Sequence, residues 1–338
     1  MRQARFLPSQ YMLQLGLWPG NSQNLVINTL MDSRLNPLIQ QALDYETVSG
    51  TSLIMTIFGD AIIHRGGCIS LASLIDMVSD FGFNERFVRT SVFRLTKDEW
   101  LTSERIGRLS FYRVTERSAH RFRQAEIRIY DMEQKTWDGR WDLVLLSSLE
   151  LEAKAQLKKE LEWLGCASIS PNLMAYPGLD QGKLRQLLRE LKMGEQVVVF
   201  QANTLDLGLD SPPPLPRMVS VNWPLEDISR RYEEFLALYR PLLPLLEDSQ
   251  TLDSGQAFQL RTLLIHHYRR LQLRDPHLPM ALLPQSWPGM AARTLCANIY
   301  NLVYQAAEEY IWSRGRTAEG PLPPADAGFY LRFGGLRR

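Results

Sequence analysis

The stretch "NERFVRTSVFRLTKDEWL", residues 84–101, decides the fold of the first domain. Val88, Val92 and Leu95 recur at three- and four-residue intervals, the spacing of one face of an α-helix. Asn84 is a good N-cap, and Glu85 suits the positive end of the helix dipole. The opposite arc of the helix carries a threonine and four cations, without an acidic residue among them: Arg86, Arg89, Thr90, Arg94 and Lys97. The sequence therefore predicts a helix with one apolar and one cationic side.

Phe93 fits this division poorly, because it lies in the middle of the cationic arc. If Phe93 packs beneath the segment that follows, the helix rolls about its axis. Arg89 then moves toward the edge of any surface that the arc presents.

The flanking segments predict three helices followed by a hairpin. "TSLIMTIFGDAII" ends at paired glycines, and "LASLIDMVSDFG" repeats apolar residues at helical spacing. "LTSERIGRLSFYRV" reads as two brief strands around a turn, with Arg105 and Arg108 on either side of Gly107. A fourth helix, "RSAHRFRQAEIRIYDM", follows. This order is typical of a winged helix-turn-helix domain, which we place at residues 36–131.

Charge is concentrated in the same window. Between residues 84 and 128, Lys and Arg outnumber Asp and Glu by 11 to 6, whereas the whole chain has a net charge of +1. Arginine has a planar fork that can meet a guanine edge or a phosphate with two hydrogen bonds. The pattern favours a recognition helix in the DNA major groove, with the hairpin arginines on flanking phosphates. The alternative is a solvated basic helix in an unrelated small domain.

The remaining chain predicts two further domains. Residues 132–205 alternate as strand, helix, two strands, helix and strand, the ferredoxin-like βαββαβ order. Residues 206–218 contain "DLGLDSPPPLPR", too rich in proline for a helix or strand, and are expected to form a linker. Residues 219–338 are mainly helical and end in a tail rich in proline and glycine. The expected fold class is therefore α+β and multidomain.

The cysteine content and the absence of long apolar runs favour a cytoplasmic protein. The three cysteines, at positions 68, 166 and 296, form no metal-binding or redox motif, as expected of a protein in a reducing cytoplasm. No apolar run approaches the roughly 18 residues of a membrane helix. Residues 1–35 show no clear periodicity and are expected to be a poorly ordered extension.

Several long blocks closely resemble the PaaX family of repressors of phenylacetic acid degradation genes. In the first domain they are "TSLIMTIFGDAIIHRGG", "FGFNERFVRTSVFRLTKDEWL" and "RIGRLSFYRVT", followed by "AEIRIYD" and "WDGRWDLVLL". The resemblance continues through "YRPLLPLL", "LLIHHYRRLQLRDPHLP", "LLPQSWPG" and "RFGGL", and so covers roughly residues 36–338.

The resemblance implies a homodimeric repressor whose middle domain is Cas2-like. Such repressors bind double-stranded operator DNA and release it when phenylacetyl-CoA binds. Neither a membrane nor a cofactor other than this effector is expected.

A segment near residue 266 is a candidate for the effector pocket. The arginines would meet the CoA phosphates, a histidine would donate a hydrogen bond, and aromatic rings would line an apolar cavity. The candidate residues are His266, His267, Arg269, Arg270, Tyr239 and Trp287. A metal site is a weaker interpretation, because adjacent histidines diverge by about 100° on a helix. The third possibility is a core helix with a polar rim.

Catalytic alternatives have little support. The chain lacks the nucleophile-elbow, P-loop and dinucleotide-binding motifs, and Asp142 at the first strand of the middle domain is a single carboxylate. We expect no catalytic site and no metal. The competing hypotheses are an enzyme acting on CoA thioesters and a Cas2-like metal-dependent nuclease.

Overall fold

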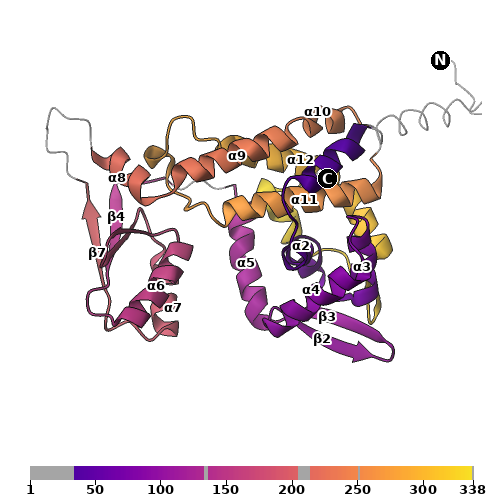
Figure 1. Cartoon of the computed structure of the whole chain (residues 1–338), viewed down its shortest axis with the longest axis horizontal. Helices are drawn as coiled ribbons and strands as arrows, with labels where there is room; N and C mark the ends of the chain where they lie inside the picture. The colour runs from indigo at the N-terminus through magenta and orange to yellow at the C-terminus, as the bar shows by residue number, and fades with distance from the viewer. Residues whose placement is uncertain (1–33, 133–135, 205–213, 250–251, 337–338) are drawn as a thin grey trace, which may run out of the picture.

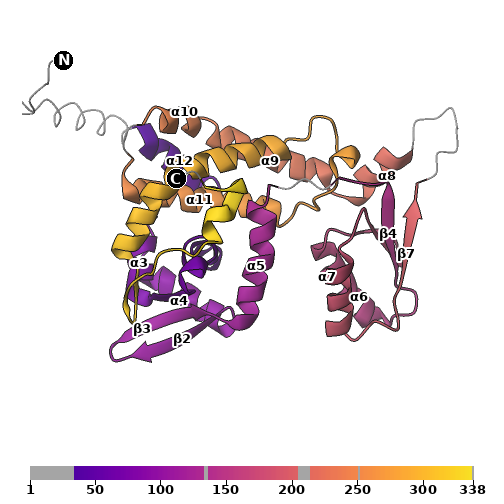
Figure 2. The ribbon, with the colours of Figure 1, turned by 180° about the vertical axis from the view of Figure 1, so that it is seen from behind.

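The computed structural model describes residues 34–132, 136–204, 214–249 and 252–336. Most of the predicted extension at 1–35 and of the predicted linker at 206–218 lies outside these residues. Figures 1 and 2 show two parts: the first domain packed with the C-terminal helices, and the middle domain beside them.

The first domain follows the predicted order of helices and hairpin. Residues 34–44 are helical, and α2 (Gly50–Ile57), α3 (Leu71–Ser79) and α4 (Glu85–Lys97) follow. Strands β2 (Leu101–Ile106) and β3 (Leu109–Val114) form the hairpin, whose turn at Gly107 has a φ of 62°. A short strand that the sequence analysis missed, β1 (Cys68–Ser70), pairs with β3 and gives a three-stranded sheet in the order β1-β3-β2.

Helix α5 (Glu116–Tyr130) leads from the hairpin toward the rest of the chain (Figure 1). It begins where the Thr115 hydroxyl accepts a hydrogen bond from the Ser118 amide. Its large buried residues, Ile129 and Tyr130, lie at the far end. Helix α5 thus spans the distance between the hairpin and the C-terminal helices.

The middle domain has the predicted βαββαβ order. Its elements are β4 (Arg140–Leu145), α6 (Leu151–Trp163), β5 (Ala167–Ser170), β6 (Leu173–Tyr176), α7 (Gln181–Glu190) and β7 (Val198–Asn203). The strands form an antiparallel sheet in the order β5-β6-β4-β7, which confirms the ferredoxin-like topology. Helices α6 and α7 cover the face of the sheet that lies toward α5 (Figures 1 and 2).

The C-terminal part is mainly helical, as predicted, but its first helix begins earlier than expected. Helix α8 (Pro214–Asn222) begins inside the predicted linker, because proline is tolerated in the first turn of a helix, where its missing N–H would have no partner. The segment 225–247 is divided into α9 (Leu225–Tyr239) and α10 (Leu242–Glu247) at Pro241. Helices α11 (Ser254–Gln272) and α12 (Gly289–Arg314) are the longest elements of this part.

The tail is more ordered than a proline- and glycine-rich sequence predicts. Strands β8 (Arg316–Thr317) and β9 (Gly320–Pro321) form a small hairpin, and a helical turn, η5 (Phe329–Gly334), follows. Phe329 and Arg332 of this turn are 1% and 2% exposed. The tail therefore belongs to the core.

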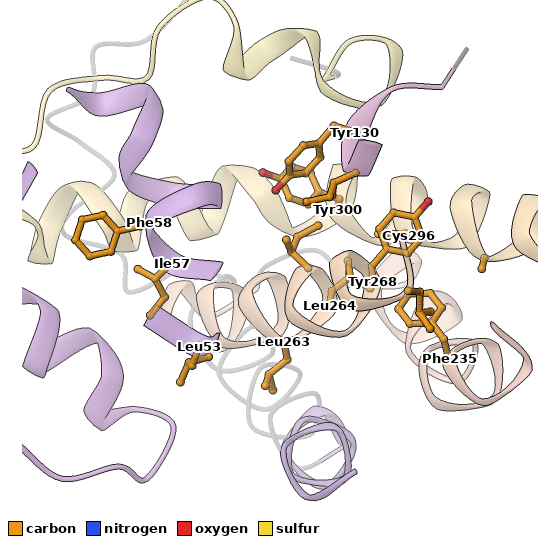
Figure 3. Packing of buried hydrophobic residues seen from close by; sticks show 14 of the residues in the cluster. Leu53, Ile57, Phe58, Tyr130, Phe235, Leu263, Leu264, Tyr268, Cys296 and Tyr300 are labelled. Atoms are coloured by element: carbon orange, nitrogen blue, oxygen red, sulfur yellow. The ribbon is translucent and has the colours of Figure 1, made fainter. Parts of the chain in front are cut away.

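The first domain and the C-terminal helices share one apolar core. Leu53 and Ile57 of α2 lie beside the α11 residue Leu263, and Phe58 and Leu264 belong to the same cluster (Figure 3). Tyr130, Tyr268, Cys296 and Tyr300 extend this packing along α11 and α12 (Figure 3). Residues 36–131 are thus not packed as an independent unit.

A buried ionic cluster, Asp60 with Arg261 and Arg332, lies inside this core. Asp60 belongs to a π-helical turn (Phe58–Ile62) that continues α2. Its carboxylate accepts hydrogen bonds from Arg261 Nε at 2.7 Å and Arg332 Nη1 at 3.0 Å. The hydroxyls of Tyr130 and Tyr300 donate to the same carboxylate at 2.7 and 2.9 Å. One carboxylate thus joins the first domain to α5, α11, α12 and the tail.

The charge of Asp60 is maintained by its partners. Burial opposes its ionisation, but the two guanidiniums and two hydroxyls outweigh that effect and lower the pKa of Asp60 below its ordinary value of 3.8.

None of the helices in the described ranges is both long and apolar enough to cross a membrane.

Replacing Asp60 by alanine should destabilise the protein strongly. The change takes the most deeply buried carboxylate partner from both Arg261 and Arg332. Loss of one partner from a buried pair costs about 3–5 kcal/mol. Urea unfolding at neutral pH measures the free energy of unfolding. Glu195→Gln, at an exposed acid, is the control and should change it by less than about 0.5 kcal/mol. Equal effects of the two substitutions would contradict the role of the cluster.

The cluster also predicts an acid limit of stability. Since the pKa of Asp60 is lower in the folded chain than its ordinary 3.8, its stabilisation is complete above that value and is lost as pH falls through the folded pKa. Below about pH 4, wild-type stability should fall more steeply than that of Asp60→Asn, which has no carboxylate to protonate. Parallel unfolding curves in acid would refute this prediction.

Candidate nucleic-acid interface and interdomain cavity

Helix α4 is held by its apolar face. Val88, Val92 and Leu95 are 0%, 1% and 3% exposed, and the Asn84 side chain accepts a hydrogen bond from the Phe87 amide at 2.9 Å. These contacts confirm the predicted apolar side and N-cap. Helix α2 approaches closely at Gly50, where a Cβ atom would lie 2.1 Å from the Ser91 hydroxyl oxygen. The axis of α4 is therefore fixed against α2.

The opposite face of α4 points to solvent. All five predicted contact residues are exposed there: Arg86, Arg89, Thr90, Arg94 and Lys97. Arg89 Nε donates to Glu85 Oε1 at 2.6 Å, and both side chains are more than half exposed. An exposed pair one turn apart contributes only about 0.3–0.5 kcal/mol, so Arg89 can exchange this partner for an anion at small cost. The other three cations form no ion pair with any described residue.

The hairpin β2–β3 carries the remaining predicted contacts. It projects from the domain beside α4 (Figure 1), and Arg105 and Arg108 are exposed at its tip. Arg105 Nε donates to the Gly107 carbonyl at 3.2 Å, which keeps the guanidinium close to the turn. The seven predicted residues are thus found on two neighbouring solvent-facing elements.

A large cavity, which the sequence does not indicate, lies between α5, the middle domain and the C-terminal helices. Its volume is about 1040 Å³. One wall is α5, another comprises α6 and α7, and a third comes from α11, α12 and the segment between them. Its lining contains exposed apolar side chains, among them Ile127, Trp163, Met280 and Met290. A cavity of this size accommodates a large organic ligand.

Both charged and apolar groups line the cavity. Arg117 and Arg121 stand on α5, and Lys183 stands on α7. Arg121 also lies over the Trp100 ring, with its Cζ 5.2 Å from the ring centroid. Acidic side chains such as Glu160 and Glu190 are present too, so the lining is mixed rather than uniformly cationic.

Arg128 of α5 also lines the cavity. Its guanidinium donates to the carbonyls of Trp163 at 2.8 Å and Asp275 at 2.7 Å. Tyr176 supports this contact by donating to the Pro276 carbonyl at 2.9 Å. The three domains therefore meet at the side chain of one α5 residue.

Only two of the six predicted effector residues, Arg269 and Trp287, line this cavity. Arg269 also donates to the Ser52 carbonyl at 2.8 Å, and its pKa is lowered by burial to about 10. The guanidinium of Arg270 points elsewhere and binds Glu46 at 2.6 Å.

The other three predicted residues are core residues that contact α2 or each other. His266 shares a hydrogen bond with the Thr56 hydroxyl at 3.0 Å, and His267 shares one with the Tyr239 hydroxyl at 2.8 Å. Burial lowers the pKa of His266 to about 2 and that of His267 to about 4, so both rings are neutral at pH 7. The arrangement corresponds to the third possibility, a core helix with polar contacts, because α11 is covered on several sides.

The Asp142 carboxylate is buried and hydrogen-bonded within the middle domain. It is 4% exposed and accepts hydrogen bonds from the Leu179 amide at 2.7 Å and the Gln201 side chain at 3.2 Å. Within the described residues, no group of three or more His, Cys, Asp or Glu side chains could hold a metal ion.

The comparisons with known proteins match these domains in the same order. Models described as PaaX-like protein, PaaX protein central Cas2-like domain and PaaX-like protein C-terminal domain match residues 49–118, 134–212 and 223–313. The Transcriptional repressor PaaX of Escherichia coli strain K12 is 43% identical over 305 residues, covering 90% of this chain and 96% of that protein. The chain belongs to the PaaX family.

A solved structure also resembles the chain. The Uncharacterized protein Rv0674 from Mycobacterium tuberculosis has a TM-score of 0.48 and 18% sequence identity. The match covers 77% of this chain and 97% of that one. At this level of similarity it supports no conclusion about the site.

Proposed function

We propose that this member of the PaaX family is a transcriptional repressor that binds operator DNA through a winged-helix domain at residues 36–131. The observation that carries the proposal is the solvent-facing cationic arc of α4, with its apolar face committed to the core. The name of the similar Escherichia coli protein, a transcriptional repressor, supports it.

The contacts divide by chemistry. On α4, which would lie in the major groove, Arg89 and Arg94 can each offer two hydrogen bonds to a guanine edge, while Thr90 can meet a phosphate or a thymine methyl. Arg105 and Arg108 at the hairpin tip would contact phosphates and set orientation without reading sequence.

The effector would be an aryl-CoA thioester such as phenylacetyl-CoA, and we assign it to the interdomain cavity, which Arg269 and Trp287 of the six predicted residues line. Met280, Met290 and Trp287 give the apolar surface that an aryl group requires. Arg121 and Lys183, on two different walls, offer charges to the phosphates. A bound ligand would touch all three domains.

Helix α5 connects this cavity to the DNA-contacting surface. The Thr115 and Ser118 hydroxyls, at the start of α5, donate to the Glu99 carbonyl at 2.9 and 3.2 Å. Glu99 directly follows Asp98, the C-cap residue of α4. A ligand that shifts α5 would therefore move α4, and a strong switch needs a preference of several kcal/mol for the shifted state.

A homodimer would place two such surfaces on one operator. The middle domain offers a surface for it, since β7 is an edge strand and one sheet face carries apolar side chains at paired positions. Leu143 pairs with Phe200 and Leu145 with Val198, and the two β7 side chains are 51% and 50% exposed. Half-sites would then lie about one helical turn, or a multiple of it, apart.

An enzyme acting on CoA thioesters and a metal-dependent nuclease are less well supported. Neither activity requires an exposed cationic arc on α4, and Asp142 already accepts hydrogen bonds from the Leu179 amide and the Gln201 side chain.

A repressor would act in the cytoplasm, where its operator DNA is.

Replacing Arg89 by alanine should weaken operator binding by about 1–3 kcal/mol, the usual cost of one lost base contact. Arg105→Ala should instead weaken binding to operator and to random DNA about equally, and reduce the slope of log affinity against log salt by roughly 1. Fluorescence anisotropy on the protein's own upstream promoter region, over a range of salt concentrations, measures both effects.

Arg230→Ala is the matched control. Arg230 is 57% exposed and also pairs with a carboxylate one turn away, but it stands on α9. It should leave DNA affinity unchanged. An Arg89→Ala variant that binds the operator as tightly as the control would reject α4 as the reading helix.

Filling the cavity should uncouple the effector from DNA. Met290→Trp places a large ring in the ligand space, so the variant should still bind operator but need at least about ten times more aryl-CoA thioester for release. Leu302→Trp is the control, because Leu302 is on the same helix, is also 41% exposed and does not line the cavity. A normal response of Met290→Trp in a DNA-release titration would exclude the cavity as the effector site.

Phe200→Asp should convert the dimer to a monomer, because a buried, unpaired charge at an interface costs several kcal/mol. Analytical ultracentrifugation gives the mass. Leu151→Asp, at an 83% exposed residue on α6 of the same domain, should remain dimeric. A dimeric Phe200→Asp variant would place the interface elsewhere.

A further inference from the structure

Phe93 is the most exposed aromatic side chain among the described residues, and it stands at the centre of the cationic arc of α4. Its exposed fraction is 69%. Arg89 and Lys97 lie one turn before and after it, and Thr90 lies three residues before it, so these side chains surround it on the helix surface.

The hairpin does not cover Phe93. The buried hairpin residues Leu101, Phe111 and Val114 pack toward the core instead. Val88, Val92 and Leu95 already occupy the inner face of α4, so a roll that buried Phe93 would expose them. Arg89 is therefore not displaced toward the edge of the arc.

Neighbouring aromatic residues have partners. Phe83 and Phe87, near the start of α4, stack with ring centroids 4.2 Å apart, and Trp100 meets Phe122 at 6.0 Å. Within the described residues Phe93 makes no such ring contact. Single exposed apolar residues are common on proteins, but this one occupies the middle of a surface whose other members are polar.

We propose that Phe93 is a specificity-determining residue that reads the 5-methyl group of a thymine in the major groove. This inference rests on the proposed function. Thymine alone presents a methyl group at the major-groove edge, and an apolar side chain such as phenylalanine recognises it by contact. A cytosine at the same place would set its N4 amino group, which needs an acceptor, against the ring.

The cationic neighbours of Phe93 would bring its ring into contact with the base. The guanidinium of Arg89 and the ammonium of Lys97 would meet a guanine edge or phosphates on either side, holding the helix deep in the groove. The phenyl ring would then exclude water from the methyl group, so that selectivity comes from apolar burial rather than from a hydrogen bond.

The experiment removes the methyl group alone. The wild-type protein first defines a footprint on its own promoter region. Each symmetry-related pair of thymines in that footprint is then replaced by deoxyuridine, and affinities are measured for wild type, Phe93→Ala, Phe93→Leu and the control Leu151→Ala, whose residue is exposed but on α6.

For wild type and the control, one deoxyuridine pair should weaken binding by about fifteenfold. This is about fourfold for each half-site, the factor expected for one buried methyl-sized group. Phe93→Ala should bind thymine and deoxyuridine operators equally, whereas Phe93→Leu should keep part of the preference. Thermal unfolding should be unchanged in both variants, because the side chain is exposed.

Two results would overturn the inference while leaving the proposed function intact. One is wild-type binding that is indifferent to deoxyuridine at every thymine, with Arg89→Ala still weakening it. The other is a deoxyuridine penalty that persists in Phe93→Ala. Wild-type protein that binds no promoter fragment would overturn the proposed function and this inference together.

Discussion

A single buried carboxylate, that of Asp60, determines how the first domain is joined to the remainder of the chain. It is 3% exposed and is surrounded by two guanidiniums and two phenolic hydroxyls from four separate segments. Charges in such a position are tolerated only when each is paired and hydrogen-bonded. The arrangement therefore sets the relative positions of α5, α11, α12 and the tail.

Around this cluster lie further ionic contacts that bind the same segments. Arg332 also binds Glu126 of α5 at 2.9 Å, and His64 shares hydrogen bonds with Glu126 at 2.5 Å and Asp326 at 2.6 Å. Arg261 donates to Glu308 of α12 at 2.7 Å. Helix α5 is thus held at its inner end by charge, at Arg128 by two carbonyls, and at its outer end by the Glu99 carbonyl. Helix α5 is therefore attached to its neighbours at both ends and not only through its apolar face.

Local patterns predicted the elements that face solvent on one side. The apolar spacing of Val88, Val92 and Leu95 was sufficient to define α4, its N-cap and its exposed cations. The order of strands and helices in the middle domain could be read in the same way. These features depend on periodicity within a short window, which the sequence contains in full.

Features that depend on distant segments could not be predicted. Helix α11 has buried residues around most of its circumference, so its periodicity did not reveal which neighbours His266 or Arg270 would meet. The cavity is formed by residues of three domains, so no single segment of sequence indicates it. The tail has a composition typical of an unstructured end, and its order depends on the contact between Arg332 and Asp60, which are far apart in the sequence. The sequence marks Phe93 as an apolar residue on a cationic face, but its exposure depends on how the hairpin packs, which the helix pattern does not contain.

The sequence separation of Arg332 from Asp60, 272 residues, has a consequence for folding. A ribosome that stops early releases a polypeptide with all of α2, α3 and α4 but without the residue that completes the Asp60 cluster. Such a fragment has at most Arg261 and two tyrosine hydroxyls to offset the buried charge of Asp60. It is therefore less stable than the full chain and is cleaved more readily by proteases.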